Sequence, residues 1–204
     1  MFFDSNAQNW DEKTYRIKRA EILSKEILNS LTTDKNFEVL DFGCGTGLIS
    51  FNLRTKFRQI TLADSSEGMI RKTEEKIKEV HAENMNAVKT SDSLEELKDK
   101  KFDIIYTSMA LHHITDTQEI LKNLYSHLKK NGQLCIIELC KENGDFHKSF
   151  PDFNGHNGFE PHEMKALAEN AGFKNISTKV IFKSYKNVKT KEIPYELFLL
   201  TAVK

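Results

Sequence analysis

The chain has 204 residues, enough for one domain with a sizeable core, and its 30 basic and 30 acidic residues cancel. This balance gives no overall reason to expect nucleic acid or an anionic membrane as a partner, and three cysteines without a CxxC pair favour a reducing compartment. The N-terminus lacks a basic region followed by a long apolar core, so we expect no signal peptide, no membrane span and a cytoplasmic protein.

Strand and helix patterns alternate along the first half of the chain. Residues 12–31 carry apolar side chains at helical spacing between charged ones, which predicts a helix. The same criteria predict strands at 37–42, 59–64, 86–90 and 102–107. Between them they predict helices at 48–57 and 66–79 and a helical turn at 94–97.

The second half continues the alternation and then changes it. Asp116 and Glu119 have the spacing of a capping box, which predicts a long helix that stops at Gly132, followed by a strand at 133–139. A further helix is predicted between Pro161 and Gly172. Two apolar runs, 176–182 and 195–203, are separated by a lysine-rich connection and predict an antiparallel hairpin.

Alternating strands and helices imply right-handed crossovers, hence an α/β fold with a mostly parallel sheet and helices on both faces. We expect a single domain over 1–204, with an N-terminal helical cap at 1–35. The irregular stretch 140–160 is long for a compact domain and is interpreted as a substrate-loop insertion.

The stretch LDFGCGTGLIS, residues 40–50, follows the first strand and holds three glycines at alternate positions, Gly43, Gly45 and Gly47. Glycines at a strand-to-helix turn allow unusual backbone angles and the close approach of a ligand. A dinucleotide fingerprint, G-x-G-x-x-G, would need its third glycine at Leu48 or Ser50, so a nicotinamide dehydrogenase is disfavoured.

The pattern Asp-x-Gly-x-Gly-x-Gly resembles the first motif of the class I S-adenosylmethionine-dependent methyltransferases. LADSSEGM, TSDSLEEL, FDIIYTSMALHHITD and LKKNGQLCIIEL resemble the later motifs in order, and HNGFEPHEMKALAENAGF resembles a segment of the small-molecule, type 11/12-like branch. The resemblance covers about residues 37 to 203. It implies a Rossmann-like sheet of seven strands, mostly parallel, with an antiparallel C-terminal strand.

The resemblance also implies roles for individual residues in holding S-adenosylmethionine. Asp64 would bind both ribose hydroxyls, and Asp41 would face the ammonium group, directly or through water. Asp92 and the main-chain amide of Ser93 would meet the adenine edge. The remaining candidates to contact this cofactor are the three glycines, Ser65, Met69 and Ser108.

Three histidines are candidates for the chemistry, because histidine titrates near neutral pH and can take a proton from an acceptor. His112 and His113 follow the fourth strand, and His156 lies within the 140–160 stretch; each could instead pack or cap. His112, His113 and Asp116 together suggest a metal, but no fourth ligand is evident, so none is expected. Trp10 is a candidate lid over the cofactor or simply packs on the domain.

The phenylalanines of the 140–160 stretch fit two interpretations equally: walls of an apolar substrate pocket, or a satellite core under a long loop. They are Phe146, Phe150, Phe153 and Phe159.

The sequence as a whole predicts a methyltransferase that acts on a small-molecule acceptor. Two alternatives stay open: an RNA or protein methyltransferase that uses the basic edge Lys174–Lys191, or a non-catalytic module that binds S-adenosylmethionine. The family's Asn/Asp-Pro-Pro-aromatic motif for base or amide nitrogens is absent, which argues against nucleic acid. The acceptor, its reacting atom and the oligomeric state are not specified by the sequence.

Overall fold

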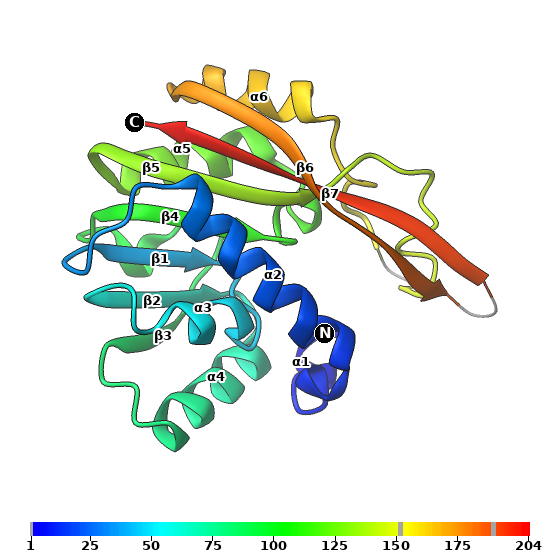
Figure 1. The fold of residues 1–204 in the computed structure, drawn as a ribbon, viewed down its shortest axis with the longest axis horizontal. Coiled ribbons are helices and arrows are strands. Elements are labelled where there is room, and N and C mark those ends of the chain that lie inside the picture. The colour runs from blue at the N-terminus through cyan, green and yellow to red at the C-terminus, as the bar shows by residue number, and fades with distance from the viewer. Residues whose placement is uncertain (1, 151–152, 189–190) are drawn as a thin grey trace.

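The computed structural model describes residues 2–150, 153–188 and 191–204. Its helices and strands follow one another along a central sheet, as Figure 1 shows. In chain order they are α1 (Phe2–Asn6), η1 (Trp10–Glu12), α2 (Thr14–Ser30), β1 (Glu38–Phe42), α3 (Leu48–Leu53), β2 (Gln59–Asp64), α4 (Glu67–Glu79), β3 (Met85–Lys89), η2 (Glu95–Leu97), β4 (Phe102–Ser108), η3 (Leu111–His113), α5 (Thr117–His127), β5 (Leu128–Leu139), α6 (Pro161–Asn170), β6 (Lys174–Val188) and β7 (Lys191–Val203).

The sheet has seven strands in the order β3-β2-β1-β4-β5-β7-β6. Strands β1 to β5 pair in parallel, and β7 runs antiparallel to both of its neighbours. This arrangement confirms the fold class predicted from the sequence. The strand order reverses direction between β1 and β4, and ligands of open α/β sheets bind at such a switch point.

Both faces of the central strands β1, β2 and β4 are buried, which explains their nearly continuous apolar sequences, whereas the edge strand β6 is mostly exposed. Successive residues of one strand enter different cores: Val39 packs with α2 and α3, whereas Leu40 packs with α5 and α6. Figure 1 shows α2 and α3 in front of the sheet and α5 behind it. None of the helices in the described residues is long and apolar enough to span a membrane.

The helix predicted to stop at Gly132 ends earlier than expected. Helix α5 stops at His127, and Leu128 is already extended and paired with Phe102 of β4. The register between β4 and β5 then shifts, so residues 129–132 bulge before Gln133 pairs with Ile104. Burying Leu128 beside β4 favours this early strand over another helical turn, a tertiary preference that local helix signals cannot report.

The predicted hairpin is confirmed but is much longer than its two apolar runs. Strand β5 pairs with β7 only from Leu197 to Val203, whereas β6 pairs with β7 as far as Lys191. The outer half of the hairpin therefore projects beyond the rest of the sheet (Figure 1). Of the predicted connection, residues 183–188 belong to β6 and 191–194 to β7, and 189–190 lie outside the described residues.

The N-terminus of α5 allows a test of the helix cap predicted at Asp116. The side chain of Asp116 accepts a hydrogen bond from the backbone N–H of Glu119 at 2.9 Å, as the capping box predicts. Replacing Asp116 with alanine should lower the free energy of unfolding by about 1 kcal/mol, because one N–H of the first turn loses its partner. Urea unfolding measures the change, with the exposed Asp99→Ala as the control; equal stabilities of the two variants would contradict the assignment.

Candidate functional site

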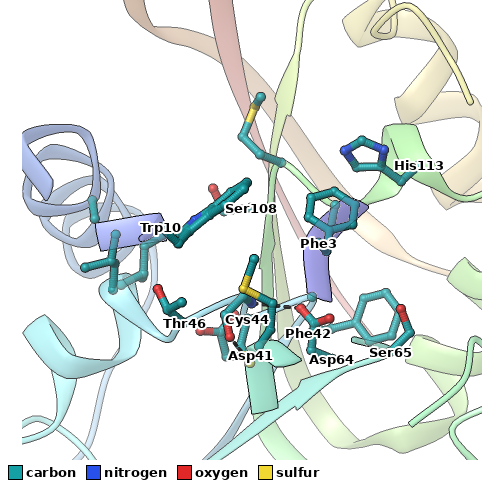
Figure 2. Close-up of a pocket in the computed structure, with 18 of the residues that line it drawn as sticks. Phe3, Trp10, Asp41, Phe42, Cys44, Thr46, Asp64, Ser65, Ser108 and His113 are labelled. Carbon is teal, nitrogen blue, oxygen red and sulfur yellow. Dashed lines mark hydrogen bonds between the residues drawn. The ribbon is translucent and has the colours of Figure 1, made fainter. Parts of the chain in front are cut away.

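A cavity of about 460 Å³ opens at the carboxyl ends of β1, β2 and β4, where the strand order reverses. Its floor is the glycine loop after β1, and its walls come from β2, β4 and the N-terminal segment (Figure 2). The predicted site residues that line it are Asp41, Gly43, Gly45, Asp64, Ser65, Met69, Asp92, Ser108 and His113.

The three glycines of the loop have positive φ angles of 71°, 55° and 76°. A Cβ atom on Gly43 would lie 2.3 Å from the Cβ of Ala110, and one on Gly47 would lie 2.8 Å from Leu62. A Cβ on Gly45 would meet no atom within 4 Å, so the space that a side chain would occupy there is part of the cavity. Gly43 and Gly47 shape the loop, and Gly47 does not line the cavity.

Asp64, the last residue of β2, ties the loop to the second strand. Its carboxylate accepts the backbone N–H of Gly45 at 2.8 Å and that of Ser66 at 2.8 Å. Burial raises the pKa of this carboxyl, and the N–H groups that it accepts counteract the rise. Asp64 still lines the cavity, so it can accept further hydrogen bonds from a ligand.

Asp41, near the end of β1, is almost fully buried beneath the loop. Burial raises the pKa of its carboxyl to about 7, although the hydroxyl of Ser50 donates to it at 2.6 Å. Tyr106 of β4 shares a 2.6 Å hydrogen bond with that same hydroxyl. A carboxyl with a raised pKa at the edge of a cavity is suited to a cationic ligand, which would stabilise its ionised form.

The third predicted acid, Asp92, is exposed but lines the cavity together with Thr90 and Ser91, and partial burial of its carboxyl raises the pKa of that group. Ser93, predicted beside it, is exposed and lies outside the cavity lining. Its hydroxyl instead shares a hydrogen bond with that of Ser91 at 2.8 Å.

The N-terminal segment covers the cavity. Asp4 of α1 accepts from the hydroxyl of Ser66 and the backbone N–H of Gly68, at the start of α4. Asp11 of η1 accepts from Thr46 in the glycine loop at 2.5 Å and from Lys76 at 2.6 Å. These contacts fix both ends of the segment to the elements that surround the cavity.

Two aromatic rings of this segment, Phe3 and Trp10, line the cavity above Asp41 and Asp64 (Figure 2). The guanidinium of Arg16 stacks 3.5 Å from the centre of the Trp10 ring. Trp10 thus lies where the lid interpretation requires it. Phe3 was not singled out in the sequence, because five residues of helix at a chain terminus give no periodic signal.

A second cavity, of about 440 Å³, adjoins the first. Phe3, Trp10 and His113 line both, and so do Arg16, Arg19 and Met109. The second cavity is walled by the 140–160 stretch and by the outer half of the β6–β7 hairpin, through residues that include Phe146, His147, Phe150, Tyr185, Lys186 and Tyr195.

The four phenylalanines of the 140–160 stretch divide between the two interpretations. Phe146 and Phe150 line the second cavity, as a substrate pocket would require. Phe159 belongs to the core that contains α5 and α6. Phe153 stacks on the ring of His147, with a centroid separation of 3.8 Å and an interplanar angle of 8°.

His112 and His113 end the short helix η3 and lie against the second cavity. The Nδ1 atom of His112 lies 2.7 Å from a carboxylate oxygen of Glu138, in β5, and both side chains are buried. The backbone N–H of Leu139 donates to the same carboxylate at 2.8 Å. Since a carboxylate oxygen only accepts, this hydrogen bond places a proton on Nδ1 of His112, so Nε2 is the nitrogen that remains for another partner.

The 140–160 stretch adds a third histidine, His147, to this pair. Burial, reinforced by neighbouring positive charge, lowers the pKa of His113 to about 2 and that of His147 to about 3, so both rings are neutral at pH 7. His147 was not singled out in the sequence, because no spacing connects it to His112 and His113, which lie 35 and 34 positions earlier. Glu138 was not singled out either, because its position within a predicted strand gives no sign of a special role.

His156, a predicted substrate-facing residue, lies away from both cavities and contacts the backbone. Its Nε2 atom lies 3.0 Å from the carbonyl oxygen of Ile114 and 3.3 Å from that of Thr115, and it lines neither cavity. Its backbone N–H donates to the carbonyl of His112 at 2.7 Å. His156 therefore attaches the 140–160 stretch to the connection between η3 and α5. Asp116 likewise caps α5 and is not part of the histidine cluster.

The chain matches known methyltransferases in sequence. Residues 15–178 match the methyltransferase-domain family. An uncharacterised methyltransferase of Schizosaccharomyces pombe is 33% identical over 183 residues, which cover 83% of this chain and 64% of that protein. A ubiquinone biosynthesis O-methyltransferase of Rickettsia felis is 29% identical over 146 residues, covering 66% of this chain and 57% of that one. The chain thus spans less than two thirds of the length of these relatives.

The fold is also found among solved structures. A methyltransferase from Aquifex aeolicus, described as S-adenosylmethionine-dependent, superimposes with a TM-score of 0.72 at 19% identity, over 98% of this chain and 97% of that one. At this identity the similarity concerns the fold. It extends over the whole sheet, including the reversed strand β7 at the C-terminus.

Proposed function

The chain belongs to the methyltransferase-domain family and has the fold of its class I, S-adenosylmethionine-dependent members, and we propose that it methylates a small, anionic acceptor molecule. The observation that carries the proposal is the pair of adjoining cavities. Acids at the strand ends line only the first cavity. The second is lined by aromatic rings and by cations, two of which, Arg16 and Arg19, also line the first.

The first cavity suits the methyl donor in its chemistry. S-adenosylmethionine has a ribose diol, an ammonium group and an adenine edge but no phosphate, and the strand ends offer acceptors instead of a phosphate cradle. Asp64 would hold the ribose hydroxyls, Asp41 the ammonium group and Asp92 the adenine edge, with Phe3 and Trp10 excluding water. When bound, the cofactor supplies an activated methyl group on its sulfonium.

The second cavity suits a small acceptor with negative charge. Lys13, Arg16, Arg19 and Lys186 line it, and no acid is among its lining residues in the part of the chain described. Lys186 donates to the carbonyl of Phe146 at 2.7 Å, and burial lowers the pKa of its ammonium to about 8. A partly desolvated cation gains more from an anionic partner than an exposed one does.

Met109 and His113 lie between the two cavities and line both. Met109 has a positive φ of 57°, an unusual backbone state for a side chain of its size, of the kind found at ligand sites. We assign His112 and His113 to contacts with the reacting group of the acceptor. A lone His113 with a pKa near 2 binds a proton too weakly to serve as an efficient general base.

The basic edge gives weaker support to an RNA or protein acceptor. Lys179 pairs with Glu26 at 2.9 Å and Lys183 pairs with Glu196 at 2.7 Å, so these charges already have partners in the molecule. Lys186 turns into the second cavity. The relatives named for ubiquinone biosynthesis in Rickettsia felis and for phosphoethanolamine in Zea mays likewise point to small acceptors for those proteins.

The proposal is tested by methyl transfer from labelled S-adenosylmethionine to matched pairs of small aromatic molecules, with and without a carboxylate or phosphate group. Transfer to the anionic members is expected. Transfer to RNA or protein alone would contradict the proposal. Binding of S-adenosylhomocysteine without transfer to any acceptor class would favour the non-catalytic module instead.

Asp64→Asn should weaken the binding of S-adenosylhomocysteine by about 1–3 kcal/mol, because the amide replaces a charged acceptor of the ribose hydroxyls. Calorimetry measures the affinity, and the exposed Asp99→Ala, which is not among the cavity-lining residues, is the control. An affinity unchanged from that of the wild type would remove Asp64 from the cofactor site.

Asp41 predicts how this affinity depends on pH. Below its pKa of about 7 the carboxyl is protonated and offers no charge to the ammonium group, so affinity should fall as pH is lowered through 7. Binding should release protons from the wild-type protein. The affinity of Asp41→Asn, in contrast, should depend little on pH in this range. Equal pH profiles for the two proteins would contradict the role given to Asp41.

Lys186→Met should raise the KM for an anionic acceptor about tenfold or more, because a charge-assisted hydrogen bond is lost. The affinity for S-adenosylhomocysteine should stay unchanged, since Lys186 lines only the second cavity. Lys179→Met, whose partner is Glu26 on α2, is the matched control. A KM that rises equally in both variants would point to a general effect of charge and not to a contact in the cavity.

A further inference from the structure

The histidine cluster beside the second cavity consists of His112, His113 and His147. One ring nitrogen of each lies within 4.8 Å of one ring nitrogen of each of the others. The ring centroids are 4.2 Å apart for His112 and His113, and 5.0 Å and 5.5 Å apart for the pairs that His147 completes. Two residues come from η3 and the third from the 140–160 stretch, so the chain brings them together only in the folded state.

Packing alone does not explain these three side chains. The Nδ1 atom of His147 is buried and has no hydrogen-bond partner within the residues that the structure describes. A buried polar atom without a partner destabilises the folded state, a cost that a phenylalanine at the same place would not incur. The ring is nevertheless held in place, stacked flat on Phe153.

A second observation concerns the hydrogen bonds that orient His112. Glu138 accepts the Nδ1–H of His112 and also the backbone N–H of Leu139, so this carboxylate fixes both the tautomer and the ring orientation. Histidines that bind zinc commonly donate their second nitrogen to a carboxylate in this way. The remaining nitrogen of His112 is then the one available to an ion.

We propose that His112, His113 and His147 bind a divalent transition-metal ion of the zinc class, with its open position facing the second cavity. Imidazole nitrogens are ligands suited to this class of ion, and three protein ligands with a free fourth position are typical of catalytic zinc sites. With Zn–N distances of about 2.0–2.1 Å, the nitrogens would be about 3.4 Å apart, so the rings need to approach by roughly 1 Å.

The role of the ion rests on the proposed function, whereas its binding does not. The three imidazoles add no negative charge and Glu138 adds one, so the site keeps a net positive charge, which favours an anionic acceptor beside Lys186. An acceptor with an O–H or S–H group would bind as its anion, its proton passing to solvent. Its lone pair would then form the bond to the methyl carbon as the C–S bond of the sulfonium breaks, with that electron pair remaining on sulfur.

The test is calorimetric titration of ZnCl₂ into the metal-stripped chain, purified without a histidine tag, together with the absorption spectrum after addition of Co²⁺. We expect one equivalent of Zn²⁺ and the intense visible bands of four-coordinate cobalt. His147→Ala should abolish both signals. Glu138→Gln should weaken Zn²⁺ binding about 10- to 100-fold, because the carboxylate that orients His112 is lost.

His162→Ala, which removes an exposed histidine on α6, is the matched control and should bind Zn²⁺ as the wild type does. Binding of S-adenosylhomocysteine, measured in the same instrument, reports that each variant is folded, since His147 lines only the second cavity. A folded wild type that binds S-adenosylhomocysteine but no Zn²⁺ would overturn the metal site and leave the proposed function intact. Unchanged Zn²⁺ binding by His147→Ala would also overturn it.

Discussion

The hydrogen bond from the backbone N–H of Gly45 to the carboxylate of Asp64 joins the loop after β1 to the end of β2, and the first cavity depends on it. The backbone N–H groups of Gly43 and Cys44 both donate to the carbonyl of Ala63, one residue before Asp64. Helix α4 adds two contacts to the same loop, from Thr73 to the carbonyl of Gly45 and from Lys76 to that of Thr46. The loop can therefore hold three left-handed glycines without collapsing into the space that a ligand needs.

Acids line only the first of the two cavities, which meet at Met109 and His113, whereas the cations Arg16 and Arg19 line both. The acids of the first cavity lie at the ends of β1 and β2 and after β3, because parallel strands bring their carboxyl ends to one edge. The cations of the second cavity come from α2 and its start and from the outer half of the hairpin. A cationic methyl donor and an anionic acceptor would each meet groups of opposite charge. As the methyl group is transferred, the positive charge of the donor and the negative charge of the acceptor would partly cancel. A site closed to water favours a transition state of this kind.

The parts of this arrangement that follow from short stretches of sequence were predictable. The glycine loop, Asp41 and Asp64 lie within 25 residues and carry their own turn and strand signals, so both their elements and their meeting could be inferred. The end of α5 and the true length of the hairpin could not, because they depend on pairing with distant strands. The contacts of His112 with Glu138 and His147 could not be predicted from the sequence for the same reason. His156 had a suitable residue type at a suitable place in the sequence, yet it folds against backbone carbonyls.

The most direct measurement of the central claim is a crystal structure of the chain with S-adenosylhomocysteine. The ribose hydroxyls are predicted to contact Asp64, the amino group to lie near Asp41, and the sulfur to face the junction of the two cavities at Met109 and His113. A ligand bound with its sulfur directed away from the second cavity, or bound outside the first cavity altogether, would contradict the account.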